Sequence, residues 1–153
     1  MIHPRAVLCA YDDWLGQQLG ESLAERKWVL REFRLPTAWV DAAAGVGPCT
    51  AVIQLDFSDE KLSGLEAVVE LRLRNPDAEI VVVCDTKLPE DDRALWLSTA
   101  LDLGARLVLF PPLTRPVLED AVLGLLEFRI GEIAAPVPSE IDLAGGEFES
   151  EAE

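Results

Sequence analysis

The sequence is poor in cysteine, histidine and basic residues, and each shortage excludes a class of protein. Its 153 residues include three Cys, one His and 13 Lys and Arg against 28 Asp and Glu, for a net charge of −15. Widely spaced cysteines without a CxxC pair are typical of reduced thiols and argue against a structural zinc site. A chain with this excess of acidic residues lacks the basic surface that binds nucleic acid or anionic lipid. We therefore expect neither nucleic acid nor membrane as a partner.

Long apolar runs and glycine-rich phosphate loops are also missing. No apolar run approaches the roughly 18 residues that span a bilayer, and residues 1–5 do not open a signal peptide, so we expect a soluble, cytoplasmic protein. The first apolar run is followed by Tyr11-Asp12-Asp13-Trp14. No GxGxxG or GxxxxGK[ST] motif occurs there, which argues against a nucleotide-binding enzyme. We expect no enzymatic activity.

The chain does contain a regular alternation of short apolar runs with stretches of helical spacing. Strands are predicted at residues 5–11, 28–33, 51–55, 79–84 and 106–110. Helices are predicted at residues 14–26, 36–44, 60–74, 89–103 and 114–126. This alternation predicts the α/β class, with a doubly wound parallel sheet and helices on both faces. With five strands we expect the flavodoxin-like order 2-1-3-4-5.

The end of the chain has a different composition. Residues 131–153 contain seven acids, no Lys or Arg, Pro136, Pro138 and a Gly145-Gly146 pair. Such a composition is typical of disorder. We therefore expect one domain over residues 1–130, which carries a net charge of −8, and a disordered acidic tail over residues 131–153.

Acidic residues follow the first and third predicted strands. Asp12 and Asp13 come directly after the first, and Asp56 directly after the third. Ligand sites in such sheets lie at the carboxyl ends of the strands where the strand order reverses. Three carboxylates converging there would repel one another unless they share a cation, and their oxygens suit Mg²⁺. The alternative is that these residues only cap helices or end strands.

Six segments carry motifs whose order and spacing can be compared with a known family. They are residues 7–13 with the Asp12-Asp13 pair, 52–57 with Asp56, 64–66 (Gly-Leu-Glu), 75–83, 100–105 and 111–118. Together they resemble the receiver domain of two-component response regulators, over about residues 5–129. The resemblance implies the flavodoxin-like fold and a role in signal transduction.

The resemblance also implies roles for single residues. Asp56 would be the phosphoryl acceptor. Asp12 and Asp13 would hold Mg²⁺ together with Asp56 and the backbone carbonyl of Ser58. The phosphoryl donor would be a histidine kinase or a phosphotransfer protein.

The chain departs from the family at three positions. Pro111 stands where the family has a lysine, and Cys84 stands where it has Thr or Ser. Cys84 and Thr86, two residues later, would be at most weak phosphate contacts. The aromatic position of the fifth strand is Val108.

Two interpretations follow from these departures. In the first, the protein is a phosphoprotein that accepts a phosphoryl group on Asp56 in a phosphorelay. In the second, it is a stand-alone pseudo-receiver that binds other signalling proteins whether or not it is phosphorylated. We favour the pseudo-receiver, because the Lys and Thr/Ser positions are occupied by Pro111 and Cys84.

Four apolar residues are candidates for protein contacts. Trp39 lies on the short second helix, and we expect it to be an exposed anchor, since Trp is enriched at interfaces. Trp96, Leu107 and Val108 belong to the fourth helix and fifth strand. Receivers dimerise or dock partners through the face formed by the fourth helix, fifth strand and fifth helix, so we expect a homodimer there.

Overall fold

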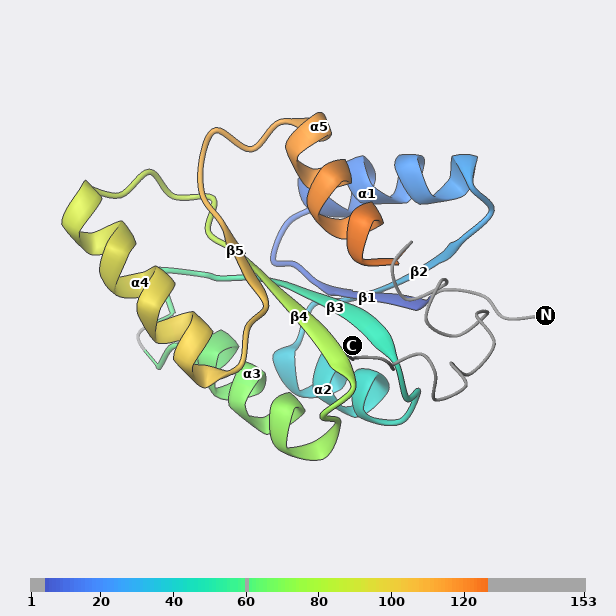
Figure 1. Cartoon of the computed structure of the whole chain (residues 1–153), viewed down its shortest axis with the longest axis horizontal. Coiled ribbons are helices and arrows are strands. Elements are labelled where there is room, and N and C mark those ends of the chain that lie inside the picture. The colour runs from blue at the N-terminus through green and yellow to red at the C-terminus, as the bar shows by residue number, and fades with distance from the viewer. Residues whose placement is uncertain (1–4, 60, 127–153) are drawn as a thin grey trace, which may run out of the picture.

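Five parallel strands lie in the order β2-β1-β3-β4-β5 in the computed structural model (Figure 1). They are β1 (Arg5–Cys9), β2 (Val29–Phe33), β3 (Cys49–Gln54), β4 (Ala78–Val83) and β5 (Leu107–Leu109). The structure describes residues 5–59 and 61–126. The sheet confirms the predicted fold class and strand order. The acidic tail predicted over residues 131–153 lies outside the described residues.

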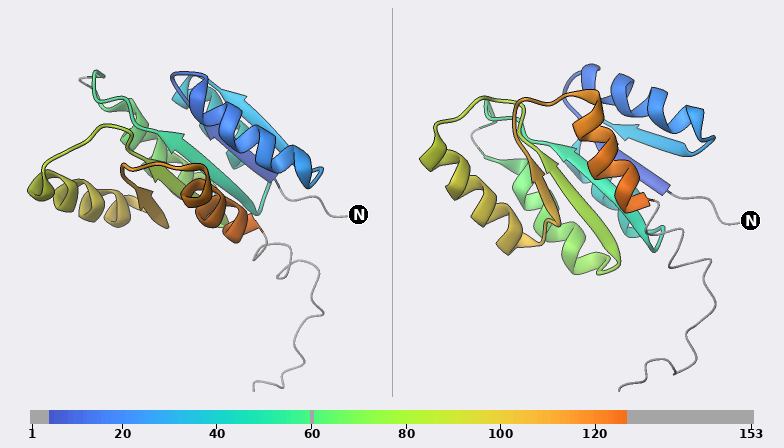
Figure 2. Two further views of the ribbon diagram at one scale, coloured as in Figure 1. Left: turned by 90° about the horizontal axis from the view of Figure 1, so that it is seen from above. Right: turned by 45° about the horizontal axis from the view of Figure 1, so that its top comes forward.

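Helices cover both faces of this sheet. They are α1 (Trp14–Glu25), α2 (Pro36–Ala44), α3 (Ser63–Arg74), α4 (Glu90–Leu103) and α5 (Arg115–Leu118), which a π-helical turn (Glu119–Leu123) continues. Figures 1 and 2 show α1 and α5 on one face and α2, α3 and α4 on the other. Within the described residues, no helix has the length and apolar character needed to cross a bilayer.

Local chemistry explains where two of these helices begin. The α5 helix starts after Thr114, whose hydroxyl accepts a hydrogen bond from the Val117 N–H at 3.4 Å, as a helix N-cap does. The α3 helix starts three residues later than predicted. Leu62 has a left-handed backbone (φ 51°), and the Asp59 carboxylate accepts a hydrogen bond from the Ser63 N–H at 3.1 Å. The chain therefore turns before it becomes helical.

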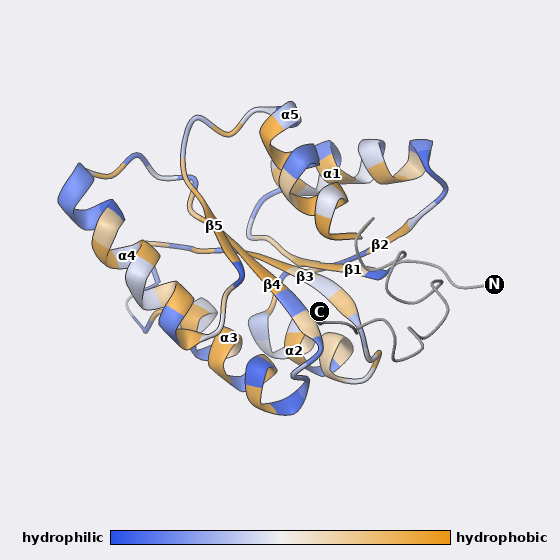
Figure 3. Cartoon of the chain, in the orientation of Figure 1, coloured by the Kyte–Doolittle hydropathy of each residue, from blue (hydrophilic) through white to orange (hydrophobic). Residues whose placement is uncertain are grey.

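The inner strands β1, β3 and β4 are apolar because both of their faces are covered. Every residue of β3 is buried, and in β4 only Glu79 is not fully buried. Alternate side chains enter two cores: Val52 and Val81 pack on the α1/α5 side, and Ile53 and Val82 on the α2/α3 side. Figure 3 shows these strands as a mostly hydrophobic layer between the helices.

Trp39 belongs to the core. It has no exposed surface, and its indole N–H donates a hydrogen bond of 3.1 Å to the Val7 carbonyl of β1. The prediction that Trp39 is an exposed anchor is therefore wrong. The indole fills the space between α2 and the sheet, and its one polar group has a partner there.

The three cysteines also lie in the core. Cys9 ends β1, Cys49 begins β3, and Cys84 directly follows β4. All three are buried, and none forms a disulfide. Burial raises the pKa of the Cys9 thiol to about 11 and that of Cys84 to about 12.

The outer edge, made of α4 and β5, is more loosely covered. The three residues of β5 are all half-buried, and α4 fully buries only Ala100. Three leucines of α4 are exposed: Leu95 by 64%, Leu97 by 39% and Leu101 by 43%. Trp96 is half-buried and packs edge-to-face on Phe57, with 5.1 Å between the ring centroids. Of the predicted contact residues, Trp96, Leu107 and Val108 thus keep some exposed surface.

Candidate functional site

The candidate site lies at the carboxyl edge of the sheet, where the loops after β1 and β3 carry the predicted acids. Asp12 is half-buried, and its Oδ1 accepts a hydrogen bond from the Trp14 N–H at 3.2 Å, at the start of α1. Asp13 is exposed and forms an ion pair with Arg34, the residue after β2. Arg34 also donates a hydrogen bond of 3.2 Å to the Ala10 carbonyl. The guanidinium therefore holds Asp13 on the β2 side of the loop.

Asp56 is half-buried and bound to its own loop. Its Oδ1 accepts hydrogen bonds from the Ser58 N–H at 2.9 Å and from the Ser58 hydroxyl at 2.6 Å. This is an Asx turn, in which the carboxylate replaces a backbone acceptor. The role of Asp56 as phosphoryl acceptor, and of the Ser58 carbonyl as a metal ligand, stay predictions.

A network that the sequence reasoning missed joins the ends of β1, β3 and β4. The Tyr11 hydroxyl lies 2.6 and 2.7 Å from the two carboxylate oxygens of Asp85. The Gln54 amide donates to Asp85 Oδ2 at 2.8 Å, and its oxygen accepts from the Tyr11 N–H at 3.2 Å. Three segments far apart in sequence are therefore held in one closed set of hydrogen bonds. We refer to these three residues as the Tyr11–Gln54–Asp85 network.

Electrostatics keep the Tyr11 hydroxyl protonated. Burial raises the pKa of Tyr11, as do its hydrogen bond to Asp85 and the negative charges of Asp85, Asp12 and Asp56. A protonated phenol is a donor, so the bond to Asp85 persists at neutral pH. The negative charges that act on Tyr11 are thus those of Asp85, Asp12 and Asp56.

Strand register places Asp85 between two positions that matter for the family resemblance. β3 and β4 pair Gln54 with Val83, and β4 and β5 pair Val83 with Leu109. Asp56, Asp85 and Pro111 each come two residues after a member of that row. Asp56, Asp85 and Pro111 therefore occupy equivalent positions in the loops that follow β3, β4 and β5.

The roles of Asp12, Asp13 and Asp56 as metal ligands stay predictions. Among residues 5–59 and 61–126, no three His, Cys, Asp or Glu side chains gather closely enough to hold a metal ion. Asp13 is paired with Arg34, and Asp85 is hydrogen-bonded to Tyr11 and Gln54. As arranged, these donors do not fit the Mg²⁺ site that the resemblance implies.

The two residues predicted as weak phosphate contacts, Cys84 and Thr86, differ in exposure. Cys84 has no exposed surface and packs in the core on the α2/α3 side, so its thiol is not available to a phosphate. Thr86 is exposed in the loop that follows. Pro111 lines a pocket of about 270 Å³ with Asp12, Trp14, Asp85 and Leu113, a lining without Lys or Arg. Within the described residues, this pocket offers acids and no cation.

Comparison with known proteins supports the fold. No protein-family model matches the chain, and no curated protein matches it in sequence. Solved structures do match it. A CheY-like response regulator receiver domain protein from Methanospirillum hungatei JF-1 is 13% identical over 86% of this chain and 99% of that chain, with a TM-score of 0.68. The chain has the receiver fold.

Two further matches widen this comparison. A response regulator from Burkholderia pseudomallei, solved with a phosphorylated aspartic acid, calcium and citrate, is 20% identical over 88% of this chain and 76% of that chain (TM-score 0.59). A protein from Rhodopirellula baltica described as an adenylate cyclase is 12% identical over 87% of this chain and 94% of that chain (TM-score 0.67). At such identities the likeness concerns the fold.

Proposed function

We propose that the protein is a pseudo-receiver, a signalling protein that uses the receiver fold to bind other proteins independently of phosphorylation. The observation that carries this proposal is Asp85, which Tyr11 and Gln54 hold in the loop after β4, while Asp56 occupies the equivalent position after the adjacent strand β3. A phosphoryl group on Asp56 would carry a charge of about −1.5 to −2 in place of the −1 of the carboxylate, which increases the negative charge at an edge that already holds Asp85. Pro111 supplies no cation to offset that charge, and Arg34 is engaged with Asp13, whereas Lys87 and Arg93 line a separate pocket with Pro111. We therefore expect the charges at the carboxyl edge of the sheet to disfavour phosphorylation of Asp56.

The outer edge supports the binding role. Leu95, Leu97 and Leu101 of α4 and Val117 of α5 are exposed large hydrophobic side chains. Exposed apolar residues grouped on neighbouring elements are typical of protein-binding surfaces. We infer that the α4–β5–α5 face, with Trp96, Leu107 and Val108, contacts another copy of the chain or another signalling protein in the cytoplasm.

Intact-mass spectrometry after incubation with Mg²⁺ and acetyl phosphate tests the proposal. We expect the wild-type chain and Asp56→Ala to show no phosphoryl adduct. A double variant, Asp85→Ala with Pro111→Lys, removes the neighbouring anion and supplies a cation, so it should form an adduct if the electrostatic argument is correct.

An adduct on the wild-type chain that is absent from Asp56→Ala would overturn the proposal. The protein would then be a phosphorylatable receiver that accepts a phosphoryl group on Asp56 from a histidine kinase or phosphotransfer protein. Mutation of Tyr11 would next show whether the Tyr11–Gln54–Asp85 network opens on phosphorylation.

A further inference from the structure

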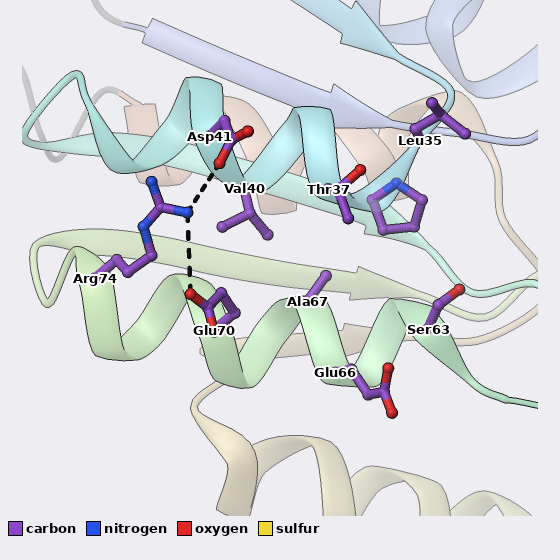
Figure 4. A pocket seen from close by; sticks show the side chains of 10 residues that line it. Leu35, Thr37, Val40, Asp41, Ser63, Glu66, Ala67, Glu70 and Arg74 are labelled. Carbon is purple, nitrogen blue, oxygen red and sulfur yellow. Dashed lines mark hydrogen bonds and ion pairs between the residues drawn. The ribbon is translucent and has the colours of Figure 1, made fainter.

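A groove between α2 and α3 shares no lining residue with the Tyr11–Gln54–Asp85 network. It has a volume of about 540 Å³ (Figure 4). Thr37 and Val40 of α2 face Ala67 of α3 across it. Val40 and Ala67 are buried and form its floor, while Leu35, before α2, is 65% exposed at one end. The groove thus offers an apolar floor and an apolar end to a side chain from outside.

Side-chain size explains why the groove is open. Ser63, Ala67 and Thr37 are small, so the two helices do not fill the space between them at this end. At the other end Arg74 bridges the helices: its Nη1 lies 2.9 Å from Asp41 Oδ1 of α2 and 3.9 Å from Glu70 Oε2 of α3. This bridge closes that end of the groove. The Arg74 guanidinium is already engaged by the carboxylates of Asp41 and Glu70.

The rim of the groove is negatively charged. Asp41, Glu66 and Glu70 line it with one cation, Arg74. Glu66 is exposed in the first turn of α3, and no cation among the described residues is paired with it. An occupant that places Lys or Arg at Glu66 would therefore gain a charge partner without displacing an existing ion pair.

Charge also argues against two other occupants. Residues 131–153 of this chain contain seven acids and no Lys or Arg, so they carry the same sign as the rim. A second copy of the chain has a net charge of −15. Both would bring further negative charge to the acidic rim of this groove, which disfavours their binding there.

We propose that the α2/α3 groove binds a basic, amphipathic segment of a partner protein. One apolar side chain of the segment lies on the floor formed by Val40 and Ala67, against Leu35. A Lys or Arg of the segment pairs with Glu66. The inference rests on the proposed role in protein binding and does not depend on the chemistry of Asp56.

Nuclear magnetic resonance of the ¹⁵N-labelled full chain tests this inference with two synthetic peptides of equal length and leucine content. One carries lysines at its polar positions and the other glutamates. We expect the lysine peptide to shift amide signals of α2 and α3 around the groove, and the glutamate peptide to shift none. Glu66→Arg should weaken binding of the lysine peptide by about tenfold or more, because it sets like charges together.

Asp92→Arg is the matched control, because Asp92 is an exposed acid in the first turn of α4 and the change in net charge is the same. It should leave binding unchanged. Thr37→Trp fills the groove without changing charge and should also weaken binding. Equal binding of both peptides, equal effects of Glu66→Arg and Asp92→Arg, or the absence of any binding would overturn the proposal. Shifts confined to α4 and β5 would overturn it too, while leaving the proposed interaction role intact.

Discussion

The inner sheet and the outer edge of this molecule use apolar residues in opposite ways. In β3 every side chain is buried, whereas in β5 every side chain is only half-buried. The α2 helix places Trp39 wholly in the core, while α4 leaves three leucines exposed. Burial of apolar surface stabilises a fold in proportion to the area removed from water. The contrast therefore assigns most of the stability to the inner strands, and the contact surface proposed above lies at the outer edge.

The largest effect on the free energy of unfolding is expected at Trp39, in the inner core. Trp39→Ala leaves a cavity between α2 and β1, and should lower the free energy of unfolding by about 3–5 kcal/mol, measured by urea denaturation. Trp39→Phe keeps most of the ring but leaves the Val7 carbonyl without its indole donor, and should cost about 1–2 kcal/mol. A cost for Trp39→Ala no greater than that for Trp39→Phe would contradict the proposed packing role.

An intermediate effect is expected at the carboxyl edge. Tyr11→Phe removes the hydroxyl that bonds Asp85 and should cost about 1–2 kcal/mol, because the hydrogen bond goes to a charged group but the side chain is partly exposed. Urea denaturation at pH 7 measures this difference. Asp85→Asn, which keeps the shape and removes the charge, serves as the control for loss of the ionic part.

The same variant has a pH signature. Burial and Asp85 raise the pKa of Tyr11 above its ordinary value of 10. The unfolded chain therefore ionises Tyr11 first, so the stabilisation is fully present below about pH 10 and is lost as the pH rises toward the higher folded pKa. Wild type should lose its advantage over Tyr11→Phe above that pH. An unchanged difference between the two proteins from pH 7 to pH 11 would contradict the hydrogen bond.

The smallest effect on stability is expected on α4. Leu101→Glu replaces a side chain that is 43% exposed and should change the free energy of unfolding by less than about 1 kcal/mol. In sedimentation-velocity experiments it should nevertheless shift a dimer toward the monomer. Leu73→Glu, on an α3 leucine that is 75% exposed, is the matched control and should leave association unchanged. Identical association of the two variants would remove the α4–β5–α5 face from consideration.

The sequence predicted the elements well, because apolar periodicity reports burial directly. All five strands were found within two residues of their bounds, since the inner strands are continuous apolar runs. The burial of Trp39 could not be predicted from apolar periodicity. The α2 helix has only nine residues, many of them apolar, so its pattern does not define which side faces the sheet. The Val7 carbonyl that accepts from the indole is 32 residues away in sequence.

The candidate site was predicted less completely than the fold. Asp12 and Asp56 lie in the loops after β1 and β3, and their predicted roles stay predictions, whereas Asp13 is paired with Arg34, a partner that the pairing of β1 with β2 brings near. The hydrogen bond between Gln54 and Asp85 could have been predicted from the sequence. A glutamine inside an otherwise apolar buried strand requires a polar partner, and an acid directly after the next strand is the nearest candidate.

The three buried cysteines allow the opening rate of the inner sheet to be measured without an engineered label. The thiolate attacks an alkylating reagent, so a thiol enclosed in the core reacts only after its surroundings open and admit water. Cys9 and Cys49 lie on β1 and β3, and Cys84 directly follows the adjacent strand β4; all three are buried. The alkylation rate of each cysteine, resolved by peptide mass, therefore reports how often its own strand is exposed. Equal rates would indicate that the sheet opens as one cooperative unit.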